Sequence, residues 1–427
     1  MKVNFTIMKE NDTETYLGDI IGNNVTEEQT FDKAIKGMEK LGEKWLKENV
    51  GIHGRTIVAN TLLTAKIVHR ASVNRISKNM KKNINKTIKA FIWGGAHKRA
   101  RVRWEIMIKH QSEGGTGLKD PVMTLDAAKI KMLQKLISRD RQPWMRWIER
   151  KLIRIANQWN VDEAMAAKPT RSQIKQLKET CLTESTLQIW LEIKGEKRPS
   201  REVVIHTNPG QLDSTIRSRW ESGFGILQED KWINIEDLKT KTVYEILTKK
   251  RSKLRGYIPN IAHNNIHKID KYLNPEERNY WWRFNHNLVS IKKTEAKYKT
   301  EKNGNLTTPN CPLCNSTEET REHYNYDCPQ LTKYRKNIAA IIGKEDFSRD
   351  EWTLKVENIQ LREIILVAKS RWIIHRERCN IDHRKNKILN HQIVLQKTKK
   401  QLQIVSTNFK EIQFETTEKN KNKNTDT

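Results

Sequence analysis

Apolar residues recur every three or four positions along several stretches of the chain, which is the spacing of one face of an α-helix. In residues 31–45 the apolar positions are Phe31, Ala34, Ile35, Met38, Leu41 and Trp45. Similar stripes occur in residues 126–138, in residues 143–159, where Pro143 suits a first helical position, and in residues 361–372. Stripes of this kind usually form a hydrophobic core. The pattern therefore predicts a mainly helical protein.

Signals for β-structure are confined to a few short stretches. Residues 15–21 (TYLGDII) are aromatic and β-branched, with glycines where turns are expected. Residues 101–108 fit either a strand or a short helix, and a glycine-rich turn follows them. Gly94 and Gly95 come directly after an apolar segment and predict a helix end. The polar stretch 194–210, with two prolines, indicates a linker.

The net charge of the chain predicts a polyanionic partner. The 427 residues include 80 Lys and Arg against 51 Asp and Glu, giving a formal net charge of +29. Thirteen tryptophans are interleaved with the basic residues, a combination that suits phosphate contacts and base stacking, although most individual tryptophans are expected in the core. The charge is not gathered on one amphipathic helix, which disfavours a membrane-surface protein. Without a signal peptide or an apolar span, we expect an intracellular protein, cytoplasmic or nuclear, with no membrane partner.

A cysteine and histidine cluster indicates a metal site. Cys311, Cys314, His323 and Cys328 have the spacing C-x2-C-x8-H-x4-C. Three thiolates and an imidazole complete a tetrahedral shell for a structural Zn²⁺, and a closed shell leaves no open position for catalysis. Five cysteines without a secretory signal do not indicate a disulfide framework. The alternative is a chance cluster that binds no metal.

Several short motifs occur in a fixed order along the chain. They are Tyr16-Leu17-Gly18, Gly54-Arg55, FIWGG at 91–95, Trp104-Glu105, GGTGLKD at 114–120, Pro143-Trp144, Cys311-Pro312-Leu313-Cys314, Glu322-His323, Cys328-Pro329, and Trp372 with Arg376 to Arg378. In this order they resemble the part of LINE-type (non-LTR) retrotransposon reverse transcriptases that follows the polymerase active site. The resemblance covers residues 13–145 and 275–380 well and residues 160–270 loosely, and Thr116 replaces the usual Leu.

The resemblance implies a division of the chain into six segments. They are a palm-end β remnant (1–25), a helical thumb-like domain (26–160), a helical linker region (161–302), a zinc-binding segment (303–345), C-terminal helices (346–414) and a disordered tail (415–427). A reverse transcriptase needs adjacent catalytic aspartates to hold its metal ions. No Asp-Asp dipeptide occurs in the chain. We therefore expect no polymerase activity and no catalytic residues, although the family is an RNA-directed DNA polymerase.

The resemblance also places candidate phosphate contacts on the thumb-like domain. They are Arg55, Lys66, Arg70, Lys81, Lys82, Lys86 and Lys89, each of which could equally lie on a solvated helix face.

The charge pattern adds two further groups of candidates. Lys98, Arg99, Arg101 and Arg103 form the densest basic segment, which could also be a plain charged loop. Trp281 and Trp282 could stack on bases with a cation–π contact from Arg283, although a core role for at least one tryptophan is favoured.

These observations lead to one preferred function and two alternatives. The preferred function is a non-catalytic fragment of a non-LTR retrotransposon reverse transcriptase that binds RNA or an RNA–DNA template–primer. The binding surfaces would be the basic thumb and a zinc knuckle. The first alternative is a zinc-stabilised helical scaffold for protein–protein interaction. The second is a thumb that acts in trans with a complete reverse transcriptase.

Overall fold

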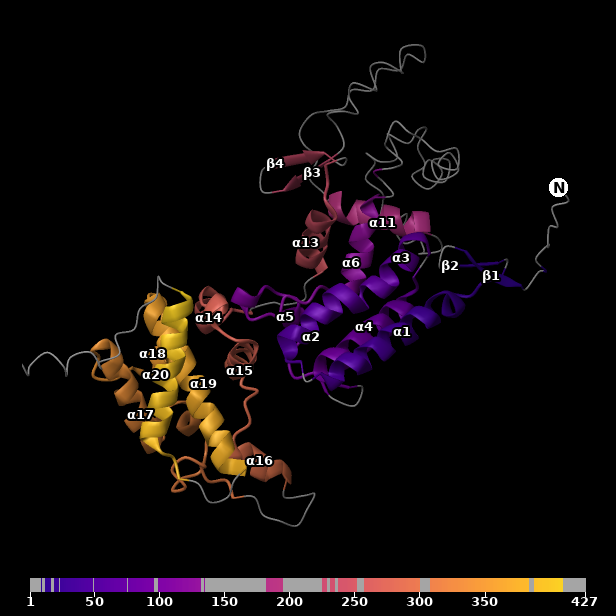
Figure 1. Ribbon diagram of the computed structural model, residues 1–427. Helices are drawn as coiled ribbons and strands as arrows, with labels where there is room; N and C mark the ends of the chain where they lie inside the picture. Colours follow the sequence, from indigo (N-terminus) through magenta and orange to yellow (C-terminus); the bar gives the residue numbers. More distant parts are fainter. Residues whose placement is uncertain are drawn as a thin grey trace, which may run out of the picture. The chain divides into compact units, whose positions relative to one another are not determined.

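The computed structural model describes fifteen stretches of the chain and divides it into two units. The described residues are 9, 12–16, 19–22, 24–48, 50–74, 76–95, 99–131, 134, 182–194, 225–228, 231–234, 237–251, 257–299, 308–383 and 388–409. The first unit comprises Met1–Asn49, Ile57–Arg99 and Lys119–Lys253, and the second comprises Val50–Thr56, Ala100–Leu118 and Leu254–Thr427. Both are mainly helical, as the apolar pattern predicts (Figure 1).

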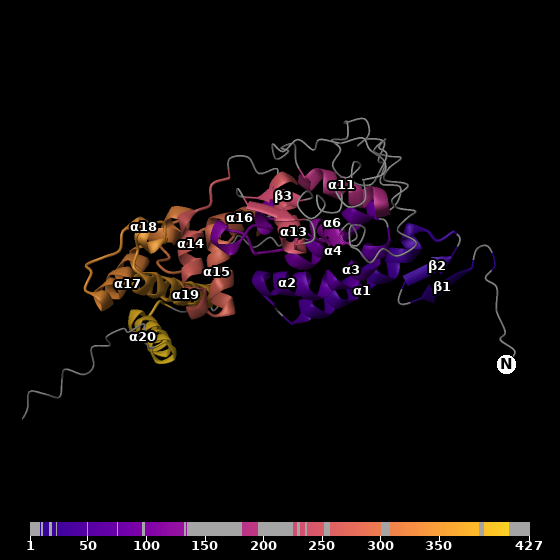
Figure 2. The ribbon, with the colours of Figure 1, turned by 90° about the horizontal axis from the view of Figure 1, so that it is seen from above.

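The first unit contains helices and two small antiparallel hairpins. Its elements are β1 (Thr13–Tyr16), β2 (Asp19–Gly22), α1 (Glu27–Lys47), η1 (Ala59–Leu63), α3 (Ala65–Val73), α4 (Lys78–Trp93), α6 (Pro121–Ala128), α11 (Leu182–Lys194), β3 (Gly225–Gln228), β4 (Lys231–Asn234) and α13 (Thr240–Arg251). β1 pairs with β2, and β3 pairs with β4. Figure 2 shows the β1–β2 hairpin next to the start of α1.

Local sequence accounts for the two long helices of this unit. Thr26 and Gln29 form a capping box at the start of α1, which satisfies two backbone N–H groups that would otherwise lack partners. Phe31 and Met38, from the predicted stripe, are fully buried and contribute roughly 1.5–3 kcal/mol each. α4 ends at Gly94, whose φ of 85° is left-handed, and so confirms the predicted helix end.

The buried carboxylate of Asp126 is the centre of an ion-pair network that links four helices of the first unit. Asp126 of α6 lies 3.6 Å from Lys81 Nζ of α4, 3.3 Å from Lys129 Nζ and 2.7 Å from Arg251 Nη1 of α13. Arg251 also pairs with Glu192 of α11 at 2.7 Å. Burial would raise the pKa of Asp126, but Lys129, Lys81 and Arg251 hold it below its ordinary value.

The second unit is built from short helices around one long helix. Its elements are α2 (Ile52–Val58), most of which belongs to this unit, α5 (Trp104–Met107), η2 (Gln111–Glu113), α14 (Ile261–Lys268), η3 (Asp270–Tyr272), α15 (Pro275–Asn285), α16 (Lys292–Lys299), η4 (His323–Asp327), α17 (Pro329–Ala339), η5 (Ala340–Ile342), α18 (Arg349–Trp352), α19 (Leu361–His383) and α20 (His391–Asn408).

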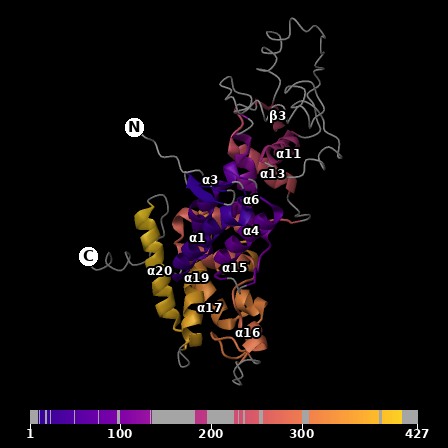
Figure 3. The ribbon, with the colours of Figure 1, turned by 90° about the vertical axis from the view of Figure 1, so that its right-hand side faces the viewer.

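Helix α19 is the centre of the second unit. Residues 364–371 of this helix are buried without interruption, so helices pack around it on more than one side. α14, α15, α17 and α20 all contact it. Figure 3 shows α20, in yellow, alongside α19. One hydrophobic core runs from α14 through the cysteine and histidine segment to α20.

Several expectations differ from the structure or lie outside the described residues. Residues 104–107 form a helix, so the strand interpretation of this segment was wrong. The region 161–302, predicted as helical, also contains the β3–β4 hairpin. The stripe at 143–159 and the tail 415–427 lie outside the described residues. Within the described part of the chain, no helix is both long and apolar enough to cross a membrane.

Candidate metal centre and nucleic-acid interface

The first two metal ligands lie in a tight backbone knuckle. Cys311 N–H donates to Thr317 O at 2.9 Å, and Asn315 N–H donates to Cys311 O at 2.8 Å. Asn315 has a φ of 54°, in the left-handed region that Asn tolerates better than most residues. This turn brings Cys314 back towards the Cys311 side of the loop, as the two-residue spacing predicts.

The other two ligands lie at the ends of a single π-helical turn. η4 begins at His323 and ends one residue before Cys328, whose N–H donates to His323 O at 3.2 Å. Cys328 is also the N-cap residue of α17, and Pro329 occupies the first position of that helix. The wider turn therefore brings His323 and Cys328 to one place while α17 starts immediately after them.

The four side chains lie close enough together to hold one metal ion. Cys311 Sγ lies 3.9 Å from Cys328 Sγ, and Cys314 Sγ lies 3.4 Å from His323 Nε2. All four ligand atoms lie within 4.8 Å of one another. A tetrahedron with Zn–S bonds of about 2.3 Å has S–S separations of about 3.8 Å. The residues therefore fit Zn²⁺, and they form a closed ligand set.

Two of the three thiols, those of Cys314 and Cys328, favour loss of their protons. A hydrogen bond with Cys311 lowers the pKa of Cys328 to about 6, and the same contact with burial raises the pKa of Cys311. Burial alone would raise the pKa of Cys314, but hydrogen bonds from Ser316 and Thr317 lower it to about 7. Metal binding removes the remaining protons, because the thiolate is the ligand form.

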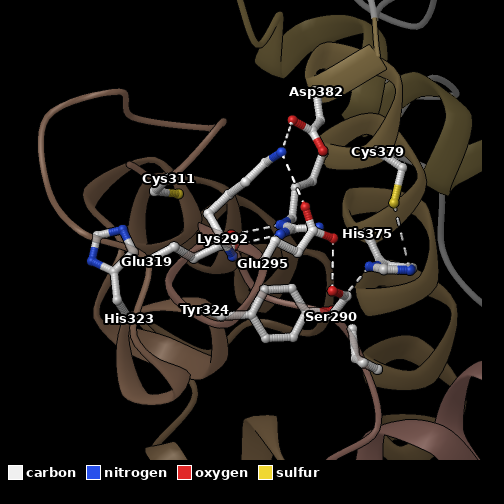
Figure 4. Close-up of polar contacts among 12 residues, drawn as sticks. Ser290, Lys292, Glu295, Cys311, Glu319, His323, Tyr324, His375, Cys379 and Asp382 are labelled. Carbon is white, nitrogen blue, oxygen red and sulfur yellow. Dashed lines mark hydrogen bonds and ion pairs between the residues drawn. The ribbon is translucent and has the colours of Figure 1, made fainter. Parts of the chain in front are cut away.

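Buried charges fix the ligand loop to α19. Glu319 is fully buried; it accepts from Arg378 Nε at 2.5 Å and pairs with Arg378 Nη2. Its carboxylate also accepts from Lys292 N–H at 2.6 Å. Figure 4 shows Glu319 between Lys292 and the ligands Cys311 and His323. Removing either partner of this pair would leave an uncompensated buried charge, which would destabilise the contact between the loop and α19.

A line of polar side chains lies behind the ligands but lacks the properties of a catalytic dyad. Tyr324 Oη is 3.0 Å from His375 Nδ1, and His375 Nε2 is 3.7 Å from Cys379 Sγ (Figure 4). Burial, with Arg378 nearby, lowers the pKa of His375 to about 3. Burial also raises the pKa of Cys379. Thiol and imidazole are therefore both neutral at pH 7, whereas a nucleophilic pair needs thiolate character.

The candidate nucleic-acid contacts of the first unit fall into two classes. Lys82 and Lys86 are exposed on α4, and Lys78, which the sequence analysis did not select, lies one turn before them. Residues four apart share one face of a helix, so these three lysines form a line, which we call the lysine line. None of them forms an ion pair with a described residue, and α4 contains no acidic residue.

Two other candidates in this unit are engaged within the protein. Lys81 pairs with buried Asp126, and Arg70 Nη1 donates to Thr30 O. These two residues are therefore poorer candidates for phosphate contacts, because each would first have to break the contact that it forms within the protein. Lys66 and Arg99 are exposed and Lys89 is half-buried. Lys98 lies outside the described residues.

For Trp281 and Trp282 the structure shows the core role that the sequence favoured for at least one of them, and not the stacking platform. Trp281 is fully buried and Trp282 is 4% exposed. Their indole N–H groups donate to Ala368 O at 3.2 Å and to Gly114 O at 3.1 Å. Both rings therefore belong to the core of the second unit and present no face to a base. Arg283, on the same helix, is exposed.

The remaining candidates of the second unit are surface or near-surface cations. Arg101 and Arg103 are exposed, and Arg103 precedes α5 as its N-cap residue. Arg55 is half-buried, and burial lowers its pKa. The structure thus brings the four candidate metal ligands together, and among the described candidate cations it places Lys82 and Lys86, with Lys78, on one face of α4. The four-residue spacing of these lysines was the signal in the sequence for Lys78.

Comparison with known proteins adds no relative to this picture. No protein-family model and no curated protein matches the chain.

Proposed function

We propose that the chain is a non-catalytic nucleic-acid-binding protein whose second unit is held together by one structural Zn²⁺. The observation that carries the metal part is the tetrahedral spacing of Cys311, Cys314, His323 and Cys328. The ion would supply folding free energy to a loop that has few apolar side chains of its own. The motif order supports an origin in the thumb and zinc-binding region of a non-LTR reverse transcriptase.

The lysine line supports RNA or RNA–DNA hybrid as the partner. Lys78, Lys82 and Lys86 advance by about 6 Å per step along α4, since a helix rises 1.5 Å per residue. Three exposed cations that pair with no carboxylate in the described part of the chain interact with phosphates through charge and counterion release, and carry no base-specific information. The net charge of +29 acts in the same direction. We therefore expect binding with little sequence preference.

A salt titration tests the binding proposal. Fluorescence anisotropy of labelled 20-nucleotide RNA and of an RNA–DNA hybrid is measured from about 50 to 300 mM KCl. A plot of the logarithm of the binding constant against the logarithm of the salt concentration should have a slope of about −2 or steeper if three lysines displace counterions. A scrambled oligonucleotide should bind equally well. Absence of binding at low salt, or a flat titration, contradicts the proposal and favours the protein-scaffold alternative.

Primer extension tests the non-catalytic part. The isolated chain with a template–primer, Mg²⁺ and deoxynucleotides should give no product, because the chain has no adjacent aspartate pair. Synthesis above that of a mock purification would overturn it.

A further inference from the structure

Helix α19 carries a buried arginine that pairs with no carboxylate of the described residues. Arg371 is 2% exposed, and among the described residues it forms no ion pair with Asp or Glu. Its Nη1 donates to Asn325 O at 2.8 Å, and its Nε is buried without a hydrogen-bond partner. Its guanidinium lies 4.3 Å from the ring centre of Phe284. A buried charge normally has a charged partner, so its counter-charge has to be located.

The protein around Arg371 leaves few choices for that counter-charge. Arg371 lines a cavity of about 20 Å³ together with Cys311, Cys328, Glu319 and Arg378. That volume holds about one water molecule, so the cavity has no room for a larger anion. Glu319 is already neutralised by Arg378. Besides Glu319, the groups of this wall that can become negative are the two cysteines and the phenols of Tyr280 and Tyr324, and of these only the cysteines belong to the candidate metal site.

Metal binding would provide the missing negative charge. Three thiolates and one neutral imidazole around Zn²⁺ carry a net charge of about −1. That charge would offset the positive charge of Arg371, which lines the same cavity as Cys311 and Cys328. This balance rests on the proposed zinc site.

Arg371 also contacts the backbone that carries two ligands. Asn325, whose carbonyl accepts from Arg371, lies in the π-helical turn between His323 and Cys328. Arg335 of α17 holds the next carbonyl of that turn, Tyr326 O, at 3.1 Å, but Arg335 pairs with Asp346 at 2.7 Å. Both arginines therefore hold a carbonyl of the His323–Cys328 turn, but Arg335 has a carboxylate partner and Arg371 has none among the described residues.

We propose that Arg371 is a positioning residue of the metal centre, which fixes the His323–Cys328 turn and supplies the counter-charge of the zinc–thiolate group. Its removal should lower metal affinity beyond the effect of losing one backbone contact. Partners of this outer kind typically change metal affinity by about 10- to 100-fold.

The test measures zinc affinity of the full chain by competition with a chromophoric chelator, with circular dichroism as a check on folding. Arg371→Met should weaken zinc binding by about 10-fold or more, and Arg371→Lys, which keeps the charge, should stay within a few-fold of wild type. Arg335→Met is the matched control: it removes a buried arginine and a contact to the same turn, and should weaken zinc binding less than Arg371→Met. If Arg371→Met does not fold, Arg371→Gln, which keeps a donor for Asn325 O, replaces it.

A variant that changes the net charge of the metal centre separates the two roles proposed for Arg371, which are to fix the turn and to supply the counter-charge. Cys314→His gives two thiolates and two imidazoles around Zn²⁺, with a net charge of about zero. In this background the loss caused by Arg371→Met should shrink to a few-fold. An equal loss in both backgrounds, an equal loss in Arg335→Met, or no loss at all overturns the inference. Failure of the wild-type chain to bind zinc would instead overturn the proposed metal site.

Discussion

At the scale of single residues, side chains of the same type differ in pKa or in pairing because their environments differ. Cys328 and Cys379 are both partly or fully buried thiols, yet hydrogen bonding lowers the pKa of Cys328 to about 6 and burial raises the pKa of Cys379. Lys81 and Lys82 are neighbours in sequence, but the first pairs with Asp126 and the second is exposed and forms no ion pair with a described residue. Residue type alone therefore does not assign function in this chain.

The thiols provide the first prediction. Cys328→Ser should abolish stoichiometric zinc binding and destabilise the second unit by several kcal/mol, because it removes a ligand and the ion's contribution to folding. Cys379→Ser is the control, since Cys379 lies outside the ligand set, and it should retain one zinc per chain. Zinc content is measured by mass spectrometry of the metal, and stability by urea unfolding. Full zinc content in Cys328→Ser would remove this cysteine from the site.

The lysine line provides the second prediction. Replacing Lys78, Lys82 and Lys86 by Gln should make the salt-dependence slope of RNA binding less negative by about 2 to 3, without unfolding the protein, because these side chains are exposed. The control is the same change at Lys33, Lys36 and Lys40. Those lysines are exposed on α1 among acidic residues, as the Lys36–Asp32 pair at 3.4 Å shows. Equal losses in the two triple variants would indicate net charge, with no special role for α4.

At the scale of elements, the glycine turn after α5 packs against α14 and α15 through a layer of histidines. Gly114 O accepts from Trp282 Nε1 and lies 2.7 Å from His286 Nε2. At Gly115 a Cβ would lie 1.8 Å from Lys109 O, so no other residue fits the turn as it stands. His263 lies over this turn, with its ring centre 4.9 Å from that of His286.

This layer predicts acid sensitivity of the second unit. His53 lies beside this layer, with its ring centre 6.3 Å from that of Trp282, and burial with Arg278 nearby lowers its pKa to about 4. Burial, with His286 nearby, lowers the pKa of His263 to about 3. The unfolded chain has histidine pKa values near 6.5, so it binds more protons than the folded state as the pH falls below that value. The contribution of these histidines to the free energy of unfolding is fully present above pH 6.5. It is lost progressively as the pH falls from 6.5 to the pKa values of the folded state. The loss at pH 5 is about 1 to 2 kcal/mol per histidine.

Urea unfolding at pH 7 and pH 5, in saturating zinc, checks this expectation. Zinc content is measured at both pH values so that metal release is not mistaken for histidine titration. His263→Phe, which removes one titrating group from the layer, should reduce the difference between the two pH values. An unchanged difference would show that His263 does not contribute to acid sensitivity.

At the scale of the whole chain, the sequence predicts local features well and long-range ones poorly. The metal ligands lie within 18 residues, so their spacing alone brings them to one place. The helical stripes of α1 and α19 are also local, and both helices are present. The burial of Trp281 depends on Ala368, 87 residues away, and the pairing of Lys81 depends on Asp126 in another helix. Neither partner can be identified from the sequence near these residues.

The central claim is that Cys311, Cys314, His323 and Cys328 bind one zinc ion that the second unit needs in order to fold. Titration of the metal-free chain with Co²⁺ tests it most directly, because tetrahedral cobalt with thiolate ligands absorbs visible light and gains intense near-ultraviolet bands from each thiolate. We predict a transition that saturates at one Co²⁺ per chain, with band intensity for three thiolates, full displacement by Zn²⁺ and a simultaneous gain of helical circular dichroism. Saturation without tetrahedral bands, or a chain equally folded with and without metal, would contradict the claim.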